Sequence, residues 1–93
     1  MEGNGVTKIV LSSAWTQGGR TEFASESGSL TDVIKGFAAA HPQYRYRLLD
    51  HDGEPFGYFN VFVDDQLVRA SERSGAVVSP GSTVTIVPPL AGG

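Results

Sequence analysis

The residues that most clearly suggest a chemical role are the last four, Leu90-Ala91-Gly92-Gly93, which directly follow Pro88-Pro89. Glycine has no Cβ, so a Gly-Gly ending lets a backbone carboxylate approach another protein's active site closely. Proline fixes φ and has no N–H to donate, so the proline pair is expected to end a strand and begin an extended arm. The sequence therefore predicts a globular domain over residues 1–88 and a flexible tail over residues 89–93. An inert tail is the alternative, because chain ends are often disordered and rich in small residues.

The two histidines are the other candidates for chemistry, and neither is predicted to have a catalytic role. His41 precedes Pro42 and is expected in the last turn of a helix, where an imidazole favours the negative end of the helix dipole. His51 lies in Asp50-His51-Asp52-Gly53-Glu54, whose side chains could bind a metal only if this short loop folded back tightly on itself. A solvated loop is the preferred interpretation. We therefore expect no bound metal and no bound cofactor.

Composition excludes several classes of function. The chain has 93 residues and no cysteine, which excludes a disulfide framework, a thiolate nucleophile, a Cys-ligated zinc and an iron–sulfur cluster. A net charge of −3 argues against nucleic-acid binding, which needs a basic face. Residues 44–47 alternate tyrosine and arginine, and we expect the rings to cover the edge of the core and the arginines to pair with nearby acids. No apolar run approaches the roughly 18 residues that span a bilayer, and no signal peptide is visible, so a cytoplasmic location is expected.

Patterns of alternating residues predict a sheet of about five strands. The first strand should have Thr7, Ile9 and Leu11 on its more apolar face, and the last should have Val84 and Ile86 on one face and Thr83, Thr85 and Val87 on the other. Glycine, proline and aspartate pairs predict the turns between strands, at residues 18–19, 64–65 and 80–81. The expected strands cover residues 6–13, 20–25, 58–63, 66–69 and 83–87, with residues 71–79 irregular.

One helix is predicted between the first hairpin and the later strands. Ser29 followed by Asp32 resembles a capping box, and apolar residues then recur at helical spacing until Pro42. Gly36 interrupts this helix at a cost of up to about 1 kcal/mol relative to alanine, which suggests a close approach to a neighbouring strand. The apolar positions that define the helix, and that should pack on the sheet, are Leu30, Val33, Ile34 and Phe37.

The order of elements predicts an α+β fold. A helix that follows a hairpin and crosses one face of the sheet allows the first and last strands to lie parallel and central. This arrangement is the β-grasp, or ubiquitin-like, fold, with one main helix and a C-terminal Gly-Gly tail.

Several stretches resemble the MoaD/ThiS family of ubiquitin-like sulfur carriers. Residues 83–93, which read TVTIVPPLAGG, look like the ending of that family. Residues 30–37 resemble its helix, residues 59–65 its central strand and following turn, and residues 79–82 the turn before its last strand. Residues 66–69 and the longer loop before Phe59 are most similar to the actinobacterial branch that supplies sulfur for cysteine biosynthesis.

This resemblance implies a protein co-substrate rather than an enzyme. The Gly93 carboxylate would be adenylated by a ubiquitin-activating-like adenylyltransferase, which supplies the ATP site, and then converted to a thiocarboxylate. The sulfur would pass to a downstream biosynthetic enzyme that makes cysteine, molybdopterin, thiamin, a thiosugar or another metabolite. Pro89, Leu90, Ala91 and Gly92 would thread the arm into the partner. The sheet face around Phe59 or Phe62 would be the docking patch; core packing is the alternative for either ring and is favoured for one of them. A ubiquitin-like modifier conjugated through Gly93, or a β-grasp interaction module, remains an alternative function.

Overall fold

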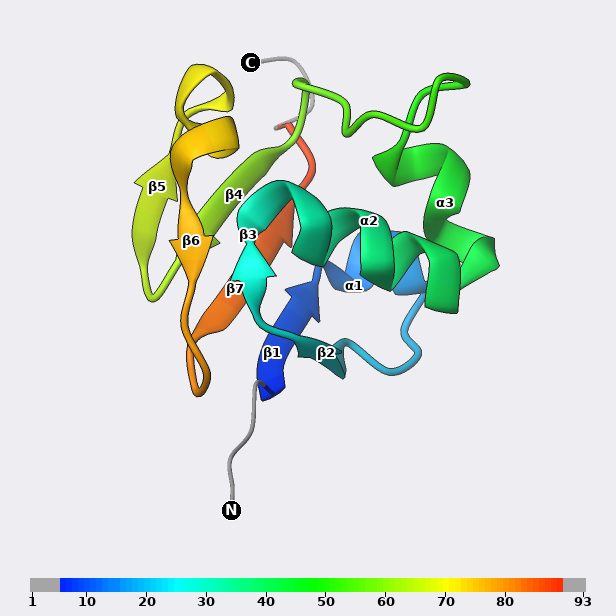
Figure 1. Ribbon diagram of the computed structural model, residues 1–93. Helices are drawn as coiled ribbons and strands as arrows, with labels where there is room; N and C mark the ends of the chain where they lie inside the picture. The colour runs from blue at the N-terminus through cyan, green and yellow to red at the C-terminus, as the bar shows by residue number, and fades with distance from the viewer. Residues whose placement is uncertain (1–5, 90–93) are drawn as a thin grey trace.

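A five-stranded mixed sheet forms the framework of this computed structural model, which describes residues 6–89 (Figure 1). Its strand order is β2-β1-β7-β4-β5, and β1 and β7 are parallel neighbours whereas the other adjacent pairs are antiparallel. The prediction that the first and last strands pair in parallel inside the sheet is confirmed. The strands are β1 (Val6–Leu11), β2 (Glu22–Glu26), β4 (Asn60–Val63), β5 (Gln66–Val68) and β7 (Thr83–Val87).

Alternation along the strands gives the sheet a buried face and an open face. Thr7, Ile9 and Leu11 of β1 are buried, as are Val84 and Ile86 of β7, which confirms both predicted patterns. Because successive side chains of a strand point to opposite faces, their neighbours lie on the open side. The sheet therefore has the hydrophobic core on one side only.

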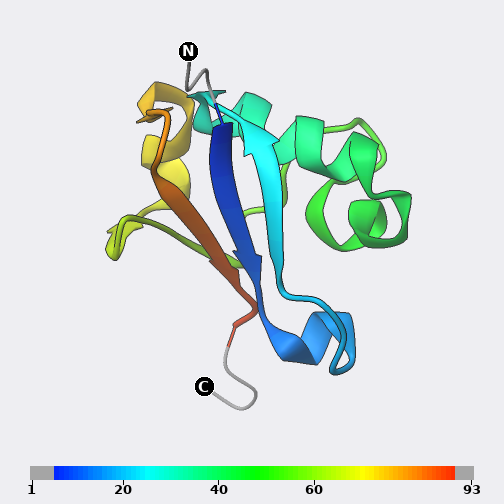
Figure 2. The same cartoon turned by 90° about the horizontal axis from the view of Figure 1, so that it is seen from below.

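The core lies between the sheet and α2 (Leu30–Ala40), which crosses one face of the sheet (Figures 1 and 2). The side-chain hydroxyl of Ser29 accepts a hydrogen bond from the Asp32 N–H at 3.1 Å, which satisfies one of the free donors at the helix start. This confirms the predicted N-cap. The apolar stripe of the helix packs into the core as expected, with Leu30, Val33, Ile34 and Phe37 all buried.

Gly36 does not have the role that the sequence suggested. A Cβ built at this position would meet no atom within 4 Å, so no strand approaches the helix there. The expectation of a close helix–strand contact at Gly36 was wrong, and its place in the helix needs another explanation.

Two helices were not predicted. The four-residue α1 (Ser13–Thr16) precedes the predicted Gly18-Gly19 turn; the Ser12 hydroxyl caps it, and it buries Trp15. The second, α3 (Pro42–Leu48), begins at the proline that was expected only to end a helix. Proline fits the first helical position because its missing N–H would have no partner there.

The predicted irregular region is partly ordered. It contains the 3₁₀ helix η1 (Ala70–Gly75) and the short strand β6 (Val77–Val78), which pairs with β3 (Gly28–Ser29). This small second sheet connects the segment before β7 to the start of α2. Among residues 6–89, none of the helices has the length and hydropathy that a membrane crossing requires.

The predicted turn at Asp64-Asp65 joins β4 to β5. Both residues have positive φ, 50° and 72°, a conformation that aspartate tolerates better than most residues. The Asp64 carboxylate accepts hydrogen bonds from the Thr83 N–H at 3.0 Å and the Ser82 hydroxyl at 2.8 Å. These bonds, that from Thr83 above all, lower the pKa of Asp64 and tie the turn to the start of β7.

Candidate functional site

The base of the predicted arm continues directly from β7. Val87, the last residue of that strand, pairs with Asn60 at the start of β4, and Pro88 and Pro89 follow outside the ladder. Pro89 is exposed. Gly93, with the threading residues Leu90, Ala91 and Gly92, lies outside the described residues, so the predicted roles of these four remain predictions.

A row of side chains crosses the open face of the sheet next to this base. Val10 of β1 is opposite Thr85 of β7, Thr85 is opposite Phe62 of β4, and Phe62 is opposite Leu67 of β5. Val87 lies two residues after Thr85 on the same face. We call Val10, Phe62, Leu67 and Val87 the outer-face patch.

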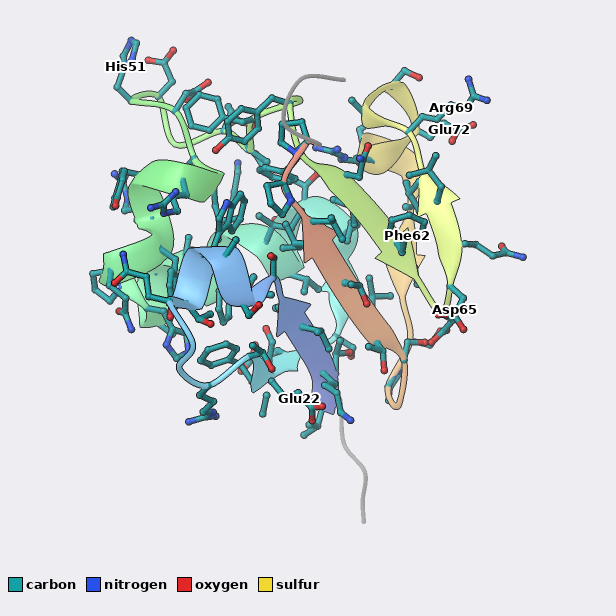
Figure 3. All side chains as sticks on the ribbon, turned by 180° about the vertical axis from the view of Figure 1, so that it is seen from behind. Glu22, His51, Phe62, Asp65, Arg69 and Glu72 are labelled. Carbon is teal, nitrogen blue, oxygen red and sulfur yellow. The ribbon has the colours of Figure 1, made fainter. Side chains whose placement is uncertain are left out.

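The outer-face patch is apolar, solvent-accessible and bordered by charge. Leu67 is 51% exposed, and the other three members are half-buried. Figure 3 shows Phe62 on the face turned away from α2, with Asp65 at one end of the β4–β5 pair and Arg69 and Glu72 at the other. On β1 and β2, the Lys8 ammonium lies 3.4 Å from the Glu22 carboxylate. An apolar centre with a charged rim is the usual anatomy of a protein-binding surface.

Phe59 does not belong to this surface, and its predicted docking role was wrong. Its side chain is only 1% exposed and makes an edge contact with Trp15, with ring centroids 6.0 Å apart. Phe59 lies in the bend just before β4 and packs into the core, whereas Phe62 lies within β4 on the open face of the sheet. The alternative of core packing applies to Phe59, and Phe62 stays a candidate for docking.

Sequence reasoning missed a buried arginine that supports the site. Arg73 of η1 donates through Nη1 to the Phe56 carbonyl at 2.8 Å and through Nη2 to the Phe59 carbonyl. Its guanidinium also lies 4.9 Å from the centre of the Phe59 ring, and burial lowers the pKa of Arg73. These contacts fix the chain just before Asn60, the residue that pairs with Val87 at the base of the arm. No local pattern marked this residue, since it lies in the stretch predicted to be irregular.

Neither histidine is part of a reactive cluster. His41 is the C-cap of α2, and its ring lies 4.5 Å from that of Phe37 and 4.9 Å from that of Phe23, between centroids. His51 is exposed at the tip of a loop far from the open sheet face (Figure 3). Among residues 6–89, no three metal-ligating side chains come together.

The loop around His51 satisfies its own polar groups. The Asp50 carboxylate accepts from the backbone N–H groups of Asp52 and Glu54. These bonds, that from Glu54 above all, lower the pKa of Asp50. Among residues 6–89, the predicted pairing of Arg47 with an acid is not found; its guanidinium lies over the rings of Trp15 and Tyr46, at 6.0 and 5.5 Å from their centres.

Comparison with known families matches residues 13–93 of this chain to the ThiS family. A curated relative, the sulfur carrier protein CysO of Mycobacterium tuberculosis, is 31% identical over 78 residues. The match covers 82% of this chain and 84% of that relative.

Solved structures agree on the fold. A chain of the Amycolatopsis orientalis BexX/CysO complex superposes with a TM-score of 0.76 at 26% identity, over 94% of this chain and 99% of that chain. Small archaeal modifier protein SAMP1 of Haloferax volcanii superposes with a TM-score of 0.78 at 20% identity, over 96% of this chain and all of its own. The SAMP1 likeness concerns the β-grasp fold alone.

Proposed function

Because this chain belongs to the ThiS family, in the branch of the CysO sulfur carriers, we propose that it carries sulfur as a thiocarboxylate on Gly93. The observation that carries the proposal is the family match, which extends through the Gly-Gly residues and is accompanied by 31% identity to a sulfur carrier. The chain serves as a protein co-substrate, and the chemistry is performed by its partners.

The chemistry begins with a poor acyl donor. A free carboxylate does not react with sulfur nucleophiles, so the Gly93 carboxylate first attacks the α-phosphate of ATP on an adenylyltransferase and releases pyrophosphate. The acyl-adenylate then has AMP as a good leaving group, and a sulfur donor displaces it to form the thiocarboxylate. ATP is bound by the activating enzyme, because this sequence has no phosphate-binding motif.

The outer-face patch is proposed as the surface that holds the partner while the arm reaches the reacting atoms. Phe62 lies opposite Thr85, which is two residues before Val87 at the base of the arm. A protein bound to the patch is therefore close to the point where the arm begins. Binding by the rigid sheet lowers the entropic cost of placing the carboxylate. The relative that was solved in a complex, CysO with BexX, supports the proposal that carriers of this type dock on other proteins.

The decisive measurement is the intact mass of the protein isolated gently from its native host, before and after treatment with a thiol-alkylating reagent. Replacement of one oxygen by sulfur adds about 16 Da and creates an alkylatable sulfur in a chain that has no cysteine. If the free protein carries only the carboxylate, and further copies are found joined through Gly93 to larger polypeptides, the modifier function would replace the proposal. If a host with an active pathway contains only the carboxylate form and no conjugates, both the sulfur-carrier and the modifier functions would be overturned.

Variants of the arm provide the control. Deletion of Gly92-Gly93 removes the acceptor carboxylate from the reach of the activating enzyme but leaves residues 6–89 unchanged, so we expect a normal melting curve and no pyrophosphate release. Gly92→Val keeps the length of the arm and adds a branched side chain near the reacting carbon. Normal adenylation of Gly92→Val would contradict the requirement for a narrow arm.

A further inference from the structure

A groove lies on the other side of the sheet from Phe62, between the edge strand β2 and α2. It has a volume of about 680 Å³ and is lined by β2 and the segment that follows it, and by one side of α2. The main lining residues are Ala24, Glu26, Asp32, Gly36 and Ala40.

The strand that borders this groove has unused hydrogen-bonding groups. β2 is the outermost strand of the five-stranded sheet and pairs only with β1 among the described residues. Leu11 donates to the Thr21 carbonyl, so Thr21, Phe23 and Ser25 turn their backbone groups toward β1. The groups of the alternate residues, Ala24 and Glu26 among them, point away from the sheet.

One part of this free edge is already occupied by the chain itself. The Arg20 Nε donates to the carbonyl of Glu22 at 2.7 Å, so that position cannot accept from another strand without displacing the arginine. Pairing is thereby directed to Ala24 and Glu26, which both line the groove. An exposed edge with open donors and acceptors is a template for an added strand.

Gly36 provides a second, independent observation. It is exposed on α2 and lines the groove, and a Cβ at this position would touch nothing in the chain. Glycine is unfavourable in a helix interior, yet the packing within this protein does not require it. The bare backbone leaves room for side chains of a strand bound beside β2.

The charge of the groove selects between possible occupants. Glu26 and Asp32 are exposed at its rim, and none of its lining residues within 6–89 is a lysine or an arginine. A second copy of this chain, paired edge to edge, would bring these acids close to one another. A segment with basic residues would meet opposite charge instead.

We propose that the groove between β2 and α2 binds an extended, basic segment of a partner protein as an additional strand. Backbone groups of Ala24 and Glu26 pair with the segment, its alternate apolar side chains lie over Gly36 and Ala40, and its lysines or arginines lie beside Glu26. The outer-face patch stays free, so this site can be occupied together with the surface that holds the activating enzyme.

The test uses the full chain, isotope-labelled, and an acetylated and amidated hexapeptide of alternating lysine and valine. Amide NMR spectra recorded during titration should show shifts at Ala24–Gly28 and at Gly36 and Ala40, with little change at Phe62 or Leu67. A hexapeptide of alternating glutamate and valine should not bind. Shifts confined to the outer-face patch, no shifts at millimolar peptide, or equal binding of both peptides would overturn the proposal.

Substitutions locate the site without disturbing the fold. Gly36→Gln fills the groove and should weaken peptide binding about tenfold, whereas Ala39→Gln, on the same helix and exposed outside the groove, should leave binding unchanged. Glu26→Gln should weaken it about two- to fivefold, the size of a cross-strand charge pair. Equal effects of the two glutamine substitutions on α2 would contradict the assigned groove, as would self-association of the free protein through β2.

Discussion

Substitution of Phe59 and of Phe62 by alanine should separate folding from docking. Phe59 is buried, and its ring touches Trp15, Tyr58 and the Arg73 guanidinium. Phenylalanine-to-alanine changes in a core cost about 3–5 kcal/mol, and two edge-packed aromatic pairs put Phe59 toward the upper part of that range. A chain of this size has a total stability of only about 5–14 kcal/mol.

Phe62 should behave differently because it lies outside the core. Its close neighbours on the open face are Thr85 and Leu67, and cross-strand pairs of this kind contribute about 0.2–1 kcal/mol. At about 5 °C per kcal/mol for a domain of this size, Phe59→Ala should lower Tm by about 20 °C, and Phe62→Ala, which loses two such pairs, by about 10 °C or less. Calorimetry of the two variants beside the unsubstituted protein gives this comparison directly.

The effects on activation by the partner enzyme should have the opposite order, with the larger loss in Phe62→Ala. Measured as pyrophosphate release at a temperature where both variants are folded, Phe62→Ala should lower kcat/KM of the activating enzyme about tenfold or more, as expected for a central docking residue. Folded Phe59→Ala should be activated nearly normally. Equal losses of stability, or full activity of Phe62→Ala, would refute the division between a core ring and a docking ring.

Substitutions at three further positions test other parts of the structure. Gly36→Ala should raise the free energy of unfolding by about 0.5–1 kcal/mol in urea denaturation, because a helix interior favours alanine and no atom blocks its Cβ; destabilisation would show that the space is not open. Asp64→Asn keeps the positive-φ turn but removes the charge. Since the pKa of Asp64 is lowered in the folded state from 3.8, the charge should stabilise the protein above pH 3.8, and the advantage over Asp64→Asn should shrink as the pH falls further; a constant difference would refute this. Arg73→Met should cost about 1–3 kcal/mol for each carbonyl left without a donor, and Arg73→Lys should recover only part of it; full recovery would show that the two-pronged contact is not needed.

Much of the fold could be predicted because local residue patterns and the core agree. Alternation in β1 and β7 identified the buried face, and the pair Ser29 and Asp32 identified the start of α2, where the hydroxyl does accept the Asp32 N–H. Asp64-Asp65 marked a turn that needs positive φ. Each of these signals acts over a few residues, which is why sequence reasoning could find it.

The errors came from residues whose role depends on distant partners. Pro42 was read as the end of a helix, although the same residue also suits the first turn of α3. Arg73 carried no local signal because its two acceptors lie 14 and 17 positions earlier in the chain. Phe59 and Phe62 have the same side chain, and only the tertiary structure separates them: the register of β4 with β7 and β5 places Phe62 on the open face, and packing against Trp15 buries Phe59.

By itself, the sequence established the family resemblance, the order of the five main strands and α2, and Gly93 as the predicted reactive end, because these depend on residue identity along a short stretch of chain. The tertiary structure was needed to bring Val10, Phe62, Leu67 and Val87 from four strands onto one face. It was also needed to place Gly36 beside the free edge of β2. Surfaces are made of residues far apart in the chain, and their composition follows from strand pairing and packing rather than from any local pattern.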